Sequence, residues 1–139
     1  MPMTNAQKAK LLDHYYGGPN LARPATLYIG LSTTTPTDTG ANFTEPVGNG
    51  YARIAVTNDS TKWNSATSAN PSVKTNKVQL EFPEATGNWG TITHWGIFEV
   101  STGGTCVDWA ALELAKAIST GDVARFKAAD LKIQLQNAS

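Results

Sequence analysis

The segment Thr26-Leu27-Tyr28-Ile29-Gly30-Leu31 shows the fold class most clearly, because Leu27, Ile29 and Leu31 recur at every second position. In an extended chain, successive side chains point to opposite faces, so residues at every second position share one face. Apolar residues with this spacing predict a β-strand with one buried face. The same alternation recurs in three further segments, residues 51–56, 77–82 and 131–135. The chain is therefore expected to consist mainly of β-strands.

A hairpin is expected in the second half of the chain. Residues 91–100 are apolar or aromatic on both faces, as in a central strand that is covered on both sides. Ser101-Thr102-Gly103-Gly104 is a turn signal, and residues 106–112 are expected to leave it as the next strand. Residues 108–117 contain strong helix formers, but their place after a hairpin turn favours a strand followed by a turn.

The N-terminal segment has the pattern of a helix instead. Residues 5–16 follow Thr4, a plausible N-cap, with Gln7 as its capping-box partner. Large apolar and aromatic residues give this helix one apolar side, namely Leu11, Leu12, Tyr15 and Tyr16. A helix of about three turns is marginal alone, so we expect this side to dock on the chain's own sheet or on a neighbouring subunit.

These patterns together predict an all-β protein with one short N-terminal α-helix. About seven short strands joined by turns are typical of an antiparallel β-sandwich, jelly-roll-like in its connections. Because Gly17-Gly18-Pro19 ends the helix firmly, we expect a helical arm over residues 1–18 and a β-sandwich domain over residues 19–139. The two parts form a single globular domain overall.

Composition argues against several classes of partner. The 139 residues carry 11 Lys plus Arg and 11 Asp plus Glu, so that no net charge attracts nucleic acid. Neither a signal peptide nor a run of about 18 apolar residues is present, and the single Cys106 forms no internal disulfide. We expect a soluble chain made in a reducing cytoplasm that binds neither nucleic acid nor membrane.

Residues for catalysis or metal binding are few and scattered. The histidines His14 and His94 and the single Cys106 do not make a zinc pattern. A pair of Cys106 and His94 across the hairpin is conceivable, but a small buried cysteine and a satisfied core histidine are expected instead. Glu81 and Glu99 are expected to be solvated residues on strands. We predict no enzyme activity, no catalytic residues, no metal and no cofactor.

Four tryptophans are many for a chain of this length. Trp95 and Trp109 lie on predicted strands and are expected in the core. Trp63 and Trp89 lie in polar segments, where an exposed aromatic side chain usually marks an interface. A protein partner is the favoured interpretation, and a glycan stacked on these rings is the alternative.

Two motifs resemble a known family. Gly50-Tyr51-Ala52-Arg53, and the run Phe82-Pro83-Glu84-Ala85-Thr86-Gly87-Asn88-Trp89-Gly90-Thr91, are similar to those of small tailed-phage virion proteins commonly labelled tail fibre or phage structural proteins. The segment 24–32 and the Gly103-Gly104 turn also match, so that the similarity covers about Leu11 to Leu135.

The resemblance implies a non-enzymatic virion component that is made in the bacterial host cytoplasm and acts by protein–protein assembly. It is expected to be a tail-fibre or tail-appendage protein or a capsid decoration protein, with a carbohydrate-binding host-recognition module as the alternative. Its partners would be other virion proteins and copies of itself, in a trimer by analogy with phage appendages. The expected interaction residues are Leu11, Leu12, Tyr15, Tyr16, Trp63 and Trp89.

Overall fold

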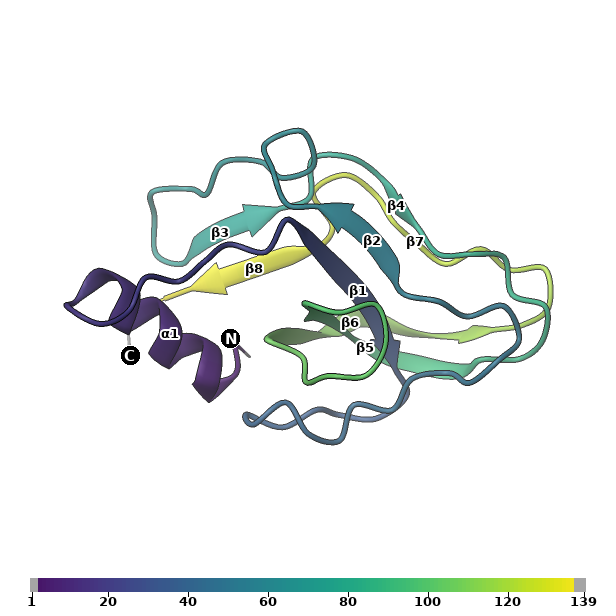
Figure 1. The fold of residues 1–139 in the computed structure, drawn as a ribbon. Helices are drawn as coiled ribbons and strands as arrows, with labels where there is room; N and C mark the ends of the chain where they lie inside the picture. The colour runs from purple at the N-terminus through teal and green to yellow at the C-terminus, as the bar shows by residue number, and fades with distance from the viewer. Residues whose placement is uncertain (1–2, 137–139) are drawn as a thin grey trace.

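The computed structural model describes residues 3–136. One helix is followed by eight strands in these residues (Figure 1). The elements are α1 (Asn5–Tyr15), β1 (Thr26–Ser32), β2 (Ile54–Thr57), β3 (Ser72–Thr75), β4 (Leu80–Glu81), β5 (Gly90–Phe98), β6 (Asp108–Ile118), β7 (Arg125–Phe126) and β8 (Lys132–Leu135). The predicted all-β fold with one short N-terminal helix is confirmed.

The largest sheet has four antiparallel strands in the order β2-β1-β5-β6. Strand β1 lies between two partners, with Ile29 opposite Ile54 on one side and Ile97 on the other. Strands β5 and β6 are antiparallel neighbours, which confirms the hairpin predicted around the Gly103-Gly104 turn. Strand β6 forms one edge of this sheet.

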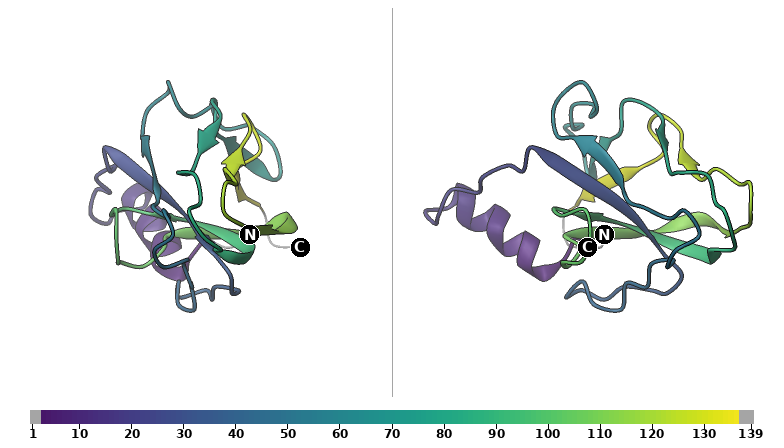
Figure 2. Two further views of the ribbon diagram at one scale, coloured as in Figure 1. Left: turned by 90° about the vertical axis from the view of Figure 1, so that its right-hand side faces the viewer. Right: turned by 45° about the vertical axis from the view of Figure 1, so that its right-hand side comes forward.

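Two small antiparallel sheets, β3-β8 and β4-β7, make the second layer. They lie along one side of the four-stranded sheet, while α1 lies outside both layers (Figures 1 and 2). One hydrophobic core joins the layers. Its buried side chains include Ile29, Val56, Trp63, Phe82, Trp89, Ile92, Trp95, Ile97 and Leu131.

Strand boundaries differ from the prediction where tertiary contacts override alternation. Strand β2 begins at Ile54, and Ala52 is exposed although alternation placed it in the core. The strand predicted over residues 77–82 is reduced to β4. Strand β3 lies in the polar segment after Trp63, where no strand was predicted. All four of its residues are half-buried, so the segment lacks the alternation that would have indicated a strand.

Strand β6 corrects the prediction of a strand followed by a turn. It continues to Ile118, but its pairing with β5 shifts between the pairs His94–Ala111 and Ile92–Lys116. The single residue Thr93 therefore lies opposite the four residues 112–115. The helix-forming residues of this segment lie in a bulged edge strand. Most of its positions are exposed, so packing does not require the β-branched or aromatic residues that are usual in strands.

Candidate functional site

The start of α1 is fixed to the body of the protein. Thr4 is the N-cap, as predicted, and its side chain accepts a hydrogen bond from the amide of Gln7. The amide of Thr4 donates to the carbonyl of Val107 at 3.1 Å, and Met3 pairs with Asp108 at the start of β6. The helix is thus attached to the edge of the main sheet through its first residues.

The far end of α1 is exposed, although its backbone is well ordered by hydrogen bonds. No residue of the helix is buried. The amide of Gly18 donates to the carbonyl of Asp13 at 2.7 Å, and the amide of Leu21 donates to Nδ1 of His14 at 3.0 Å. These bonds fold the chain back on the helix after its last turn.

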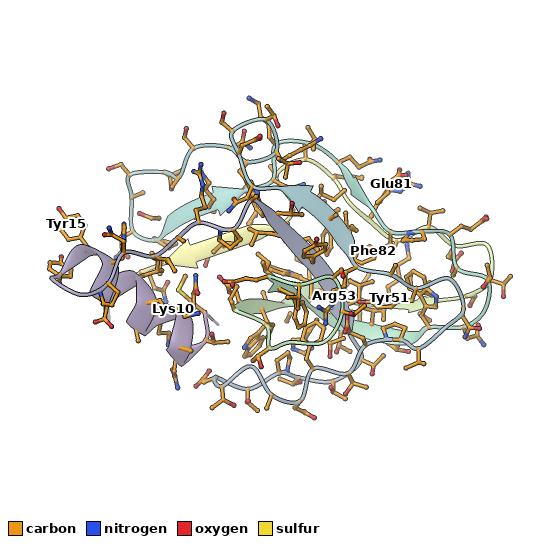
Figure 3. All side chains as sticks on the ribbon, viewed as in Figure 1. Lys10, Tyr15, Tyr51, Arg53, Glu81 and Phe82 are labelled. Carbon is orange, nitrogen blue, oxygen red and sulfur yellow. The ribbon has the colours of Figure 1, made fainter. Side chains whose placement is uncertain are left out.

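Three large side chains project from this end, and we call them the helix tip: Leu12, Tyr15 and Tyr16. They are 60%, 79% and 74% exposed, respectively. The rings of Tyr15 and Tyr16 contact each other edge to face, with centroids 4.9 Å apart. Figure 3 shows Tyr15 at the extremity of the molecule, pointing away from the sheets. Of the predicted interaction residues on the helix, only Leu11 is partly buried.

The prediction that Trp63 and Trp89 form an exposed interface is wrong. They are 5% and 4% exposed and belong to the core. The indole of Trp89 donates to the carbonyl of Asn49 at 2.9 Å. Their polar sequence neighbours occupy loops that turn the indoles inward, so the exposure expected from composition is lost. Trp95 is buried as predicted, while Trp109 is only half-buried.

The burial of Trp63 and Trp89 also bears on the glycan alternative. Sugar recognition by stacking needs an accessible aromatic face, and neither indole offers one. The exposed aromatic rings of α1 belong to the two tyrosines of the helix tip. The glycan alternative was based on the expected exposure of Trp63 and Trp89, and the structure does not support that expectation.

An open groove lies between β6 and the segment from Val123 to Lys132. Its volume is about 540 Å³. Apolar side chains line its floor, including Phe82, Ile92, Trp95, Leu112 and Phe126. Leu114 also lines the groove and is 82% exposed. Arg125 and Phe126 of β7 line the groove together with β6.

Charged side chains surround the groove. Four are basic and two acidic, namely Lys116, Arg125, Lys127, Lys132, Glu113 and Asp130. Within the described residues, one of these six side chains forms an ion pair: Arg125 pairs with Glu81, which lies outside the groove lining, at 3.9 Å. Both side chains are about half exposed. The rim is therefore locally positive on a chain of zero net charge. Sequence analysis missed this site, because it forms only where β6 and the segment that follows it meet core residues from distant parts of the chain, such as Leu31 and Phe82.

The Gly50-Tyr51-Ala52-Arg53 motif builds a buried polar network. Arg53 donates to both carboxylate oxygens of Glu45 at 2.8 Å and to the carbonyls of Val100 and Gly103. The hydroxyl of Tyr51 donates to the same carboxylate at 2.6 Å. Figure 3 shows Tyr51 and Arg53 close together within the body of the protein. The network ties the β5-β6 hairpin loop to the strand region before β2.

Gly50 and Phe98 complete this region. The φ angle of Gly50 is +81°, and a Cβ there would lie 2.7 Å from the carbonyl oxygen of Glu84. Such a position accepts only glycine without rearrangement. The guanidinium carbon of Arg53 lies 3.5 Å from the centroid of the Phe98 ring, a cation–π contact. Burial, reinforced by the hydrogen bond to Glu45, raises the pKa of Tyr51. The motif is thus a structural clamp.

The candidate catalytic pair does not form. Cys106 is buried, and its Sγ lies 3.8 Å from the carbonyl of Gly40. His94 pairs with Ala111 in the ladder, well beyond the hairpin end where Cys106 lies, and its Nδ1 contacts the hydroxyl of Thr93 at 2.8 Å. Burial raises the pKa of the Cys106 thiol to about 11 and lowers the pKa of His94. Both shifts disfavour the charged forms that a thiolate–imidazolium pair needs.

Other charged candidates are also separated. Glu81 and Glu99 are exposed. No cluster of three or more His, Cys, Asp or Glu residues capable of holding a metal ion occurs within residues 3–136. Over the same residues, no helix has the length and apolar character required to cross a membrane.

Comparison with known proteins gives one family. The family described as podophage GP4 fiber I protein gp80 matches residues 2–134, nearly the whole chain. No curated protein sequence matches the chain significantly. The match includes α1, both layers of the sandwich and the two motifs that carried the resemblance to phage virion proteins. The chain therefore belongs to the podophage GP4 fiber I protein gp80 family, a family of structural fibre proteins of the bacteriophage virion.

Proposed function

We propose that the chain is a non-enzymatic subunit of a phage tail fibre and assembles with other virion proteins through its helix tip. Membership of a fibre protein family supports a tail fibre over a capsid decoration protein. The observation that carries the assembly role is α1 itself, a helix with no buried residue whose last turn exposes Leu12, Tyr15 and Tyr16.

The helix tip has the properties of an interface anchor. Burying a large apolar side chain contributes about 1.5–3 kcal/mol, and tyrosine is enriched at the centre of protein interfaces. The hydrogen bonds from Gly18 and Leu21 fix the last turn before any partner arrives. A surface that is already ordered loses less conformational entropy on binding.

The remaining chemistry of the chain supports a structural role. The buried Cys106 and the exposed Glu99 line a pocket of about 260 Å³ beside the start of α1, but neither His94 nor Glu81 lines it. The most specific motif residues, Arg53 and Trp89, stabilise loops and core. The chemically distinctive residues of the body are thus engaged in holding the fold, and the outer surface is left for interaction.

The experiment compares phage particles that carry Tyr15→Ser/Tyr16→Ser with particles that carry the wild-type chain. We expect at least a tenfold loss of the protein from purified particles, measured by quantitative mass spectrometry. The isolated variant should unfold within about 0.5 kcal/mol of wild type, because both tyrosines are exposed.

Val47→Ser is the matched control. Val47 is an apolar residue that is 91% exposed and lies far from α1 in sequence, so this change should leave incorporation at the wild-type level. Normal incorporation of the double tyrosine variant would refute the proposed role of the helix tip. Equal loss in both variants would show a general surface effect and would refute it as well.

A further inference from the structure

We infer that the groove beside β6 binds a small organic anion, with one acid group on an aromatic or aliphatic body. The inference goes beyond the proposed assembly role, because it concerns a different part of the surface. The groove is lined by β6, the segment from Val123 to Lys132 and core residues, and within residues 3–136 this lining includes no part of α1.

The groove has the size of a small-molecule site. Its volume of about 540 Å³ lies within the range of about 300–1,000 Å³ that is usual for such sites. Phe82, Ile92 and Trp95 are at most 4% exposed and close the floor, so a ligand reaches mainly partly buried side chains such as Leu112 and Phe126. These offer far less than the roughly 1,200–2,000 Å² that a stable protein interface buries, which favours a small ligand over a macromolecule.

The rim supplies positive charge that has no partner in the chain. Lys116, Lys127 and Lys132 line the groove, and they form no ion pair within the part of the chain that the structure describes. Ammonium groups donate charge-assisted hydrogen bonds to carboxylate, sulfonate and phosphate oxygens. A ligand with an acid group at the rim and an apolar body over the groove therefore complements both parts of the lining.

The acidic residues of the rim limit the charge of the ligand. Glu113 and Asp130 accompany the four basic residues, which leaves a net charge of +2 on the lining. A polyanion would meet both carboxylates as well as the cations, and like charges at close range repel. A single acid group can contact the lysines alone. The groove therefore favours a monoanion over a polyanion.

The backbone that carries these cations is held by hydrogen bonds. Lys116 and Lys132 are paired in the ladders of β6 and β8, respectively. The carbonyl of Lys127 accepts a hydrogen bond at 2.9 Å from the side-chain amide of Asn76, which is fully buried. The charged groups thus start from fixed points around one apolar groove, which reduces the entropy lost on binding.

Fluorescence titration of the purified chain with anilinonaphthalene sulfonate tests the inference. This probe carries one sulfonate on an aromatic body, and the neutral probe phenylnaphthylamine has the same body without the sulfonate. We expect the sulfonate to bind with a Kd below about 100 µM. The neutral probe should bind at least tenfold more weakly, because it leaves the lysines without an acceptor.

Two variants of exposed residues locate the site. Lys127→Gln/Lys132→Gln removes two charges from the rim, and Leu114→Asp adds a carboxylate to the groove. Each should weaken binding of the sulfonate at least tenfold, while the double lysine variant should bind the neutral probe as the wild type does. Lys8→Gln/Lys10→Gln removes the same charge from exposed positions of α1 and should behave as the wild type with both probes.

Four results would overturn the inference: no binding of the sulfonate, equal binding of the two probes, unchanged binding in either groove variant, or an equal loss in the α1 lysine variant. Tyr15→Ser/Tyr16→Ser should retain full binding, since the helix tip does not line the groove. Loss of binding in that variant would place the site at the tyrosines and would also refute the inference. Incorporation into particles is measured separately, so the proposed function can stand when this inference fails.

Discussion

The clamp around Arg53 and the helix tip are both rich in polar and aromatic groups, yet they are opposite in environment. The Arg53 side chain is 4% exposed, and its guanidinium donates to one carboxylate and two carbonyls of the same chain. Tyr15 and Tyr16 are more than two-thirds exposed, and Figure 3 places Tyr15 at the edge of the molecule. The chain therefore separates the residues that stabilise the fold from those left for partners.

This difference teaches how to interpret the family motifs. Gly50, Tyr51 and Arg53 build the clamp, and Phe82, Ala85 and Trp89 of the second motif are buried in the core. The motifs that identify the family thus specify its fold. Substitutions in them should reduce stability, whereas substitutions at the helix tip should reduce assembly.

The largest effect on stability is expected for Trp89→Ala. Removing a buried indole from a packed core costs about 3–5 kcal/mol, and the carbonyl of Asn49 also loses one of its two donors and keeps only the amide of Thr86. The measurement is the free energy of unfolding from urea denaturation. Tyr15→Ala is the control and should change it by less than about 0.5 kcal/mol. Similar losses for the two variants would show that the helix tip packs on the chain's own body.

A smaller effect is expected for Arg53→Met, which keeps the length of the side chain but removes its charge and donors. The loss should be about 2–3 kcal/mol, below the usual cost of breaking a buried pair because Glu45 is 24% exposed and can be hydrated. Lys10→Met on the exposed surface of α1 is the control and should be neutral in the same denaturation experiment. An Arg53 variant as stable as the wild type would disprove the clamp.

The smallest effect concerns Asp108, which lies where the helix joins the body. Burial raises the pKa of this carboxyl from 3.8 to about 7. The fold therefore favours the protonated acid, and this contribution is complete below pH 3.8 and is lost as the pH rises through about 7. Asp108→Asn should raise the free energy of unfolding at pH 8, because the amide carries no charge that burial disfavours. It should also flatten the pH dependence of that free energy between pH 4 and pH 8.

The wild type and the Asp108 variant are compared by urea denaturation at each pH. Asp122→Asn changes an exposed carboxylate and serves as the control. A wild-type slope that persists in the Asp108 variant would show that another group is responsible.

Sequence reasoning predicted local structure well where the spacing of apolar residues follows the period of a strand or a helix. The alternation around Ile29 and the helical spacing before Gly17 correspond to β1 and α1. It failed for Trp63 and Trp89, because a polar segment can bring a single aromatic residue back into the core. It also missed the groove, since residues 111–118 and 123–132 come together as its walls only in the folded chain. Such features depend on tertiary packing that local patterns do not encode.

The central claim is that the protein works through its outer surface, with the helix tip as its anchor. Electron cryo-microscopy of intact phage particles at side-chain resolution tests this most directly. The account predicts that Leu12, Tyr15 and Tyr16 of each assembled copy are buried against another protein chain. A particle in which all three side chains remain in solvent, while some other surface of the chain makes the contacts, would contradict it.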